Sequence, residues 1–162
     1  MAKIAADALA LLPPDSAALI ALINASLDSG IACFDLADVY GGYRCEVQFG
    51  DSLAASGIRR EAVRIVSTYG VRGLSPERTE NTIKHDDNSG AYITRCTDLS
   101  LKALRTEYLD LLLLQRQDFL IEADDAATAL DAAIRAGKIR HGNSDPGNSD
   151  AEYDFIETVF RI

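Results

Sequence analysis

The sequence predicts an α/β fold built on a parallel sheet, and three features of the chain support this prediction. Apolar runs typical of buried strands recur four times along the 162 residues. Their residues do not alternate with polar ones, as expected for strands that are covered on both faces. Stretches with a helical spacing of apolar residues separate the runs, and this alternation of strand and helix indicates a parallel sheet with right-handed crossovers.

The first helix and the first strand open this pattern. Asp15 or Ser16 would cap a helix over residues 15–30, whose apolar residues share one face and whose last residue, Gly30, is a fitting stop. The apolar run IACFDL, residues 31–36, then predicts the first strand.

A second helix and strand follow, and a long loop comes after them. A helix that ends at Gly57 is predicted over residues 45–57, and the run AVRIVST predicts a strand over residues 62–68. Residues 70–88 are rich in Gly, Pro, Asn and Asp and show little periodicity, so they predict a long loop. Long loops inside compact domains are often functional.

The rest of the chain repeats the alternation. A helix is predicted over residues 89–105, and the run YLDLLLLQ predicts a strand over residues 108–115. An alanine-rich helix with acids in its first turn follows over residues 122–137. A fourth strand over residues 138–142 and a last helix over residues 151–160 complete the order αβαβαβαβα.

Two architectures fit this order: a doubly wound open sheet and a (β/α) barrel. No G-x-G-x-x-G motif follows any of the predicted strands, so a dinucleotide-binding open sheet has no positive support. Four strands are fewer than the eight or so of a complete barrel. The residues alone leave both architectures open.

Composition excludes several classes of function. The net charge of −9 and the pI of about 4.6 argue against nucleic-acid binding, which requires a basic face. No apolar run is long enough to span a membrane. The three cysteines and two histidines are too widely spaced to predict a metal site, so we expect reduced thiols in a cytoplasmic protein.

Polar side chains gather where the predicted strands end, and in both parallel architectures the carboxyl ends of the strands form the site. The first two strands end in Asp35, Asp38, Tyr40, Thr68 and Tyr69. The next two end in Gln115, Arg116, Asp118, His141, Asn143 and Ser144.

A phenol at such an edge could donate a proton. Its ordinary pKa is about 10, so it would need a nearby cation or buried hydrogen bonds to act near neutral pH. The alternative is structural: Asp35 would cap the next turn, Tyr40 would pack, and Gly41 and Gly42 would supply a bend.

Three stretches of the chain resemble the aldo-keto reductases, in particular their bacterial oxidoreductase branch. Residues 27–53, LDSGIACFDLADVYGGYRCEVQFGDSL, are similar to the family signature G-x-x-x-F-D-x-A-x-x-Y-G. Residues 83–118 and 126–141 resemble the helices and strands that follow it in the family. The resemblance covers about residues 16–160 and implies a partial TIM-type (β/α) barrel over residues 15–162.

The family resemblance also implies an activity and the residues that carry it. Aldo-keto reductases transfer a hydride from NADPH to an aldehyde or ketone, a small-molecule substrate, and a tyrosine protonates the new alkoxide. A lysine paired with an aspartate tunes that tyrosine, and a histidine orients the carbonyl. Asp35 and Tyr40 match the aspartate and the tyrosine, five residues apart, and Asn143 and Ser144 are candidates for holding the nicotinamide amide.

The chain departs from the family pattern at the two other catalytic positions. Thr68 stands where the family has its lysine, and Gln115 stands where it has its histidine. Without the lysine, the phenol of Tyr40 stays a weak acid, so we expect the carbonyl reduction to be impaired or lost.

The chain also departs from the family in its extent. Residues 1–14 do not resemble the first strand of the barrel and are expected to be an N-terminal extension. The last strands and helices, which carry most contacts to the cofactor phosphates in the family, are missing. The alternatives are a non-catalytic remnant of a barrel that serves as a binding or interaction module, and a fragment with no function of its own. Two open sheet edges would favour self-association.

Overall fold

The protein forms one parallel sheet covered by helices, as seen in a computed structural model that describes residues 15–114 and 123–142. The sheet has the order β1-β2-β5-β6, and every pairing in it is parallel. Its strands are β1 (Cys33–Ala37), β2 (Arg64–Tyr69), β5 (Leu109–Leu114) and β6 (Ile139–Gly142). The four predicted strands are thereby confirmed.

In the described part of the chain, one α-helix precedes these strands and three more separate them, as predicted. They are α1 (Ser16–Asp28), α2 (Cys45–Ser56), α3 (Gly90–Leu104) and α4 (Ala123–Arg135). The carboxylate of Asp15 accepts a hydrogen bond from the N–H of Ala17 at 3.0 Å, and Gly57 ends α2 in the left-handed conformation. Residues 1–14 and the helix predicted over residues 151–160 lie outside the described part of the chain.

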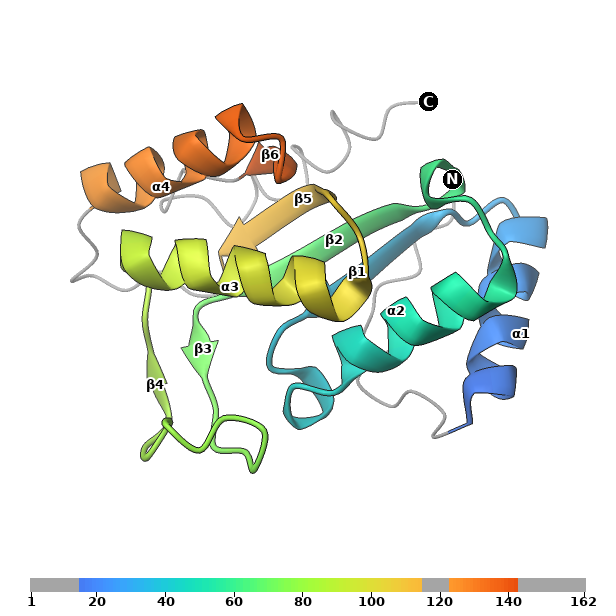
Figure 1. Ribbon diagram of the computed structural model, residues 1–162, viewed down its shortest axis with the longest axis horizontal. Helices are drawn as coiled ribbons and strands as arrows, with labels where there is room; N and C mark the ends of the chain where they lie inside the picture. Colours follow the sequence, from blue (N-terminus) through green and yellow to red (C-terminus); the bar gives the residue numbers. More distant parts are fainter. Residues whose placement is uncertain (1–14, 115–122, 143–162) are drawn as a thin grey trace.

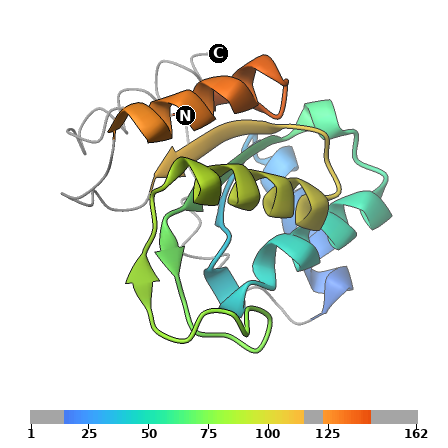
Figure 2. The same cartoon turned by 60° about the vertical axis from the view of Figure 1, so that its left-hand side comes forward.

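All four helices pack against one face of the sheet (Figures 1 and 2). Phe34 and Leu36 of β1 join the main core there, beside apolar residues from each helix. A smaller cluster of Val66, Leu111 and Leu113 occupies the opposite face, here called the inner face. Because apolar side chains are buried on both faces of the sheet, the apolar runs in the sequence do not alternate.

The long loop predicted over residues 70–88 contains structure that the sequence did not indicate. Strands β3 (Val71–Arg72) and β4 (His85–Asp86) pair antiparallel and form a narrow ribbon. In Figures 1 and 2 this ribbon leaves the main sheet, and its loop lies beside the turn that follows β1. Two-residue strands are too short to show an alternating pattern, so the sequence predicted a loop.

A buried carboxylate ties the sheet together near the amino end of β5. Asp110, whose side chain is 3% exposed, accepts hydrogen bonds from Arg60 at 2.8 Å, Arg140 at 3.2 Å and the backbone N–H of Ile65 at 3.0 Å. The guanidinium groups of Arg60 and Arg140 also stack on the ring of Tyr108, at 4.1 and 4.0 Å from its centre. These contacts join β2, β5 and β6.

Helices α2 and α3 approach most closely at Gly50. A Cβ atom added there would lie 2.5 Å from the carbonyl oxygen of Ala103 and 2.6 Å from the Cα of Leu104, so the backbones would have to separate. We expect Gly50→Ala to destabilise the protein by about 1 to 3 kcal/mol, although alanine is the better helix former. Urea unfolding measures the loss.

The control for Gly50 is Ala54→Gly, at an exposed position of the same helix. It should cost about 1 kcal/mol through helix propensity alone. A Gly50→Ala protein that is more stable than the parent would show that the two helices can separate at no cost.

Candidate active site

Asp35 and Thr68 share the inner face of two adjacent strands. Asp35 stands between Phe34 and Leu36, which point into the main core, so the alternation of a strand directs it to the other side. Asp35 is paired in register with Val66, and Thr68 follows two residues later on the same face of β2. Both side chains are half-buried.

Tyr40 lies immediately after β1, at the carboxyl end of the sheet. It begins a short 3-10 turn, η2 (Tyr40–Gly42), and its half-buried side chain packs against the main core. The N–H of Asp38 bonds to the carbonyl of Thr68 at 3.1 Å, so the chain stays paired with β2 until just before the turn. The structure therefore brings Asp35, Tyr40 and Thr68 to one end of the β1–β2 pair.

The other residues predicted for this site divide into three groups. His141 is described: it is exposed on β6 and is paired in register with Leu111 of the inner face. Gln115, Arg116, Asp118, Asn143 and Ser144 lie outside the described residues. Asp38 and Tyr69 are described, but both belong to the helix-covered side of the sheet and do not face the inner side. Both lie where their strands end, as predicted, but Asp38 has the same strand parity as Phe34 and Leu36, and Tyr69 has the same parity as Ile65, so their side chains take the helix-covered side.

Asp38 is instead a buried acid beneath α3. Its side chain is 92% removed from solvent, and its Oδ2 atom accepts weak hydrogen bonds from the hydroxyl of Tyr92 and the thiol of Cys96, each at 3.5 Å. Within the described part of the chain its Oδ1 atom has no hydrogen-bond partner. Burial raises the pKa of Asp38 to about 6, and the contacts with Cys96 and Arg78 oppose this rise.

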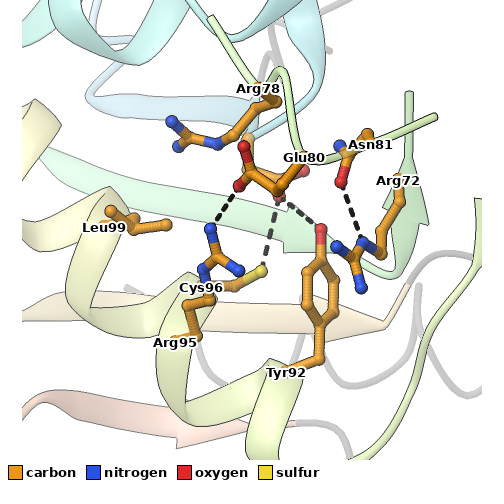
Figure 3. A pocket seen from close by; sticks show the side chains of 9 residues that line it. Arg72, Arg78, Glu80, Asn81, Tyr92, Arg95, Cys96 and Leu99 are labelled. Carbon is orange, nitrogen blue, oxygen red and sulfur yellow. Dashed lines mark hydrogen bonds and ion pairs between the residues drawn. The ribbon is translucent and has the colours of Figure 1, made fainter. Parts of the chain in front are cut away.

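A small polar cavity adjoins Asp38 between the ribbon and α3 (Figure 3). Its volume is about 10 Å³, close to the space that one water molecule needs. Arg72, Arg78 and Asn81 of the ribbon and Tyr92 of α3 help to line it. The cavity is separate from the inner face, where Asp35 and Thr68 lie.

Glu46 is a second buried acid, and it was not among the residues predicted for the site. It lies on the core side of α2 and accepts a hydrogen bond of 2.7 Å from the hydroxyl of Ser67 on β2. Burial raises the pKa of Glu46 to about 7, and hydrogen bonds from Ser67 and Ser100 oppose the rise. A usable signal was present: Glu46 falls between Cys45 and Phe49 on the apolar stripe of its helix.

Two classes of site find no support in the described part of the chain. None of its helices combines the length and the apolar character that a membrane span requires. Nor do its His, Cys, Asp and Glu side chains form a cluster of three suited to a metal ion.

The sequence of the chain matches the Aldo/keto reductase family model over residues 9–147. The chain belongs to the aldo-keto reductase family. An uncharacterized oxidoreductase of Bacillus subtilis, YcsN, is 41% identical over 125 residues, which are 77% of this chain and 42% of that protein. The oxidoreductase YdhF of Escherichia coli is 40% identical over 76% of this chain and 41% of its own length. A 6-dehydroglucose reductase of Agrobacterium fabrum is 36% identical over 74% of this chain and 40% of its own length.

Solved structures of aldo-keto reductases share the fold. AKR11C1 from Bacillus halodurans, in its holo form, matches with a TM-score of 0.70 and 27% identity over 83% of this chain and 43% of that one. The glycerol dehydrogenase AKR11B4 from Gluconobacter oxydans matches with a TM-score of 0.71 and 25% identity over 97% of this chain and 47% of that one.

These comparisons decide between the two architectures that the residues left open. The four parallel strands alternating with helices are a partial (β/α) barrel, so this prediction is confirmed. The chain spans about two-fifths of the length of the curated relatives that it matches.

Proposed function

We propose that the chain is an aldo-keto reductase-like oxidoreductase for the NADPH-dependent reduction of an aldehyde or ketone, in which proton transfer is severely weakened. The observation that carries this proposal is the placement of Asp35 and Thr68 on one face of adjacent strands, with Tyr40 at the same end. The family lysine would stand at Thr68, two residues along the inner face from the partner of Asp35.

The chemistry of this site rests on the phenol of Tyr40. Bound NADPH would supply the hydride, and Tyr40 would donate its proton to the oxygen of the carbonyl that is reduced. A lysine ammonium beside the phenol would favour the phenolate and ease this donation. Thr68 is uncharged and can offer only a hydrogen bond, so the phenol stays a weak acid. General acid catalysis typically contributes about 10²- to 10⁴-fold, and most of this factor is expected to be missing.

The described residues do not by themselves fit the phosphates of NADPH. Near the carboxyl ends of the strands, the inner face of the described part presents Asp35, Ala37, Thr68, Leu113 and His141, a set without arginine or lysine. A pyrophosphate is ordinarily held by arginine, lysine or the N-terminus of a helix. Cofactor binding would therefore depend on residues outside the described ranges, among them Asn143 and Ser144.

Restoring the two family side chains tests the proposal. The double variant Thr68→Lys with Gln115→His should reduce aldehydes faster than the parent, by up to about 10²- to 10⁴-fold, in protein that binds NADPH. A titration with NADPH establishes binding first, and NADPH oxidation in the presence of an aldehyde then measures the rate. Adding Tyr40→Phe to the double variant should abolish the gain, because the proton donor is then gone.

Each outcome of this experiment points to a different defect. A double variant that binds NADPH yet reduces no aldehyde faster than the parent would contradict the assigned roles of Thr68 and Gln115. If neither protein binds NADPH, the lack of cofactor binding is the dominant defect, and the alternative of a non-catalytic interaction module is favoured.

Self-association of the chain remains a prediction. Within the described residues β1 and β6 each pair with only one neighbouring strand, so the described sheet has two open edges. Analytical ultracentrifugation measures the oligomeric state, and a strict monomer would contradict the prediction.

A further inference from the structure

Tyr43 joins the turn after β1 to the loop of the β3–β4 ribbon. Its side chain is 7% exposed, and its hydroxyl accepts hydrogen bonds from the N–H of Gly73 at 2.7 Å and from the side-chain amide of Asn81 at 3.2 Å. The same hydroxyl lies 3.4 Å from the carbonyl oxygen of Gly73, to which it can donate its proton. Burial raises the pKa of Tyr43, which keeps that proton in place.

Two further contacts fasten the same loop to the same turn. The hydroxyl of Ser75 donates a hydrogen bond of 2.9 Å to the carbonyl of Gly42, and the guanidinium of Arg78 lies over the ring of Tyr43 at 4.9 Å from its centre. We call Tyr43 and its loop partners Gly73, Ser75, Arg78 and Asn81 the clasp.

The loop side of the clasp is itself held in place. Arg72 bonds to the side-chain oxygen of Asn81 at 3.0 Å (Figure 3). It also forms an ion pair of 3.1 Å with Asp87, just beyond β4. Glu80 forms an ion pair with Arg95 of α3 (Figure 3). The loop is thus anchored to the body of the domain, and the phenol of Tyr43 binds to a fixed partner.

The turn side of the clasp has an unusual backbone. Gly41, Gly42 and Tyr43 have φ values of 57°, 65° and 71°, all in the left-handed region. This region suits glycine, but a bulky residue such as Tyr43 occupies it only when its surroundings impose it. The N–H of Tyr43 bonds to the carbonyl of Tyr40 at 3.0 Å, so the strained residue closes the turn that Tyr40 begins.

We propose that Tyr43 is a positioning residue whose phenol, held by the clasp, fixes the left-handed turn that sets the position of Tyr40. This inference rests on the proposed function, in which Tyr40 donates the proton. Tyr43 does not touch the substrate. It acts through the backbone of the turn, because releasing its phenol allows Tyr43 to leave the left-handed region and the turn to rearrange.

The test uses Tyr43→Phe, which removes the hydroxyl and keeps the ring under Arg78. Two measurements are made on the full chain labelled with fluorotyrosine: the ¹⁹F resonance of Tyr40, assigned with Tyr40→Phe, and the rate of tryptic cleavage after Arg78. We expect cleavage to become about tenfold faster or more, because Gly73 loses its buried acceptor. We also expect the Tyr40 resonance to shift or to split.

The matched control is Tyr108→Phe. Tyr108 is at the other end of the sheet, and its hydroxyl is buried without a hydrogen-bond partner among the described residues. Removing this hydroxyl should change neither the Tyr40 resonance nor the cleavage rate after Arg78.

Two results would overturn the proposal. Faster cleavage with an unchanged Tyr40 resonance would make Tyr43 a structural anchor of the loop only. No change in either measurement would show that the hydroxyl of Tyr43 fixes neither the loop nor the turn. If Tyr43→Phe does not fold, Asn81→Ala takes its place, because it removes one hydrogen-bond donor to the hydroxyl of Tyr43. The same two measurements are then made on Asn81→Ala. Neither measurement needs NADPH or turnover. A protein without reductase activity can therefore still confirm or contradict the role of Tyr43.

Discussion

Replacing Asp110 by alanine is expected to lower the free energy of unfolding by about 3 to 5 kcal/mol. The carboxylate is buried and bonds to Arg60, Arg140 and the backbone N–H of Ile65. Alanine would leave the guanidinium of Arg60 without its buried counter-charge and the N–H of Ile65 without an acceptor, and both losses are costly away from water. Urea unfolding followed by circular dichroism measures the change.

Two comparisons separate the charge of Asp110 from its hydrogen bonds. Asp110→Asn keeps an oxygen that can accept from Ile65 and removes the charge, so its loss should be intermediate. Asp98→Ala breaks an exposed ion pair of 2.6 Å with Lys138 and should cost less than about 1 kcal/mol. If Asp110→Ala and Asp98→Ala lower the free energy of unfolding equally, burial does not strengthen the contacts of Asp110.

The second large effect is a fall in stability as the pH rises from about 4.5 to about 7, caused by Glu46. Its pKa is about 7 in the folded protein against an ordinary value of 4.5, so the folded state holds its proton more tightly than the unfolded state does. The stability that protonated Glu46 contributes is fully present below pH 4.5 and is lost as the pH rises through 7. One pKa unit corresponds to about 1.4 kcal/mol, so the expected loss is about 3 kcal/mol.

The variant Glu46→Gln should remove this pH dependence. Glutamine has the shape of the protonated acid and can still bond to Ser67, so the variant should match the parent near pH 4.5 and exceed its stability by about 3 kcal/mol at pH 8. Unfolding curves at pH 5, 6, 7 and 8 make the comparison.

Asp38 also contributes to the pH dependence of stability, and Glu77 provides a control. The raised pKa of Asp38, about 6, gives a loss of the same sign between about pH 4 and 6, so the step between pH 6 and 8 isolates Glu46. Glu77 is exposed, and Glu77→Gln should leave the curve unchanged. Parallel pH curves for Glu46→Gln and the parent would contradict the assignment.

The repeating strands and helices could be predicted because their signals are local. The run LDLLLL of β5 is apolar except for one aspartate and has the length of a strand. Asp15 and Gly57 mark helix ends through their own conformational preferences. The ribbon of β3 and β4 could not be predicted in this way. Its two strands are two residues each, and their pairing depends on a turn that no short motif specifies.

The contacts of the buried acids were beyond local signals as well. Asp110 meets Arg60 at a separation of 50 residues, and Asp38 meets Cys96 at a separation of 58. Strand parity could have placed Asp38 on the helix-covered side, because it continues the series of Phe34 and Leu36. The roles of Asp35 and Tyr40 came from the family resemblance, since an acid and a phenol after a strand also have a structural interpretation.

The strand order has a consequence for synthesis on the ribosome. Among the described strands of the main sheet, each pairs with the strand that precedes it in that sheet, and none is inserted between two earlier ones. Each newly emerged strand can therefore dock on an edge that already exists, and its helix can then cover it. Such vectorial growth needs no earlier pairing to break, so the nascent chain can gain its sheet one strand at a time.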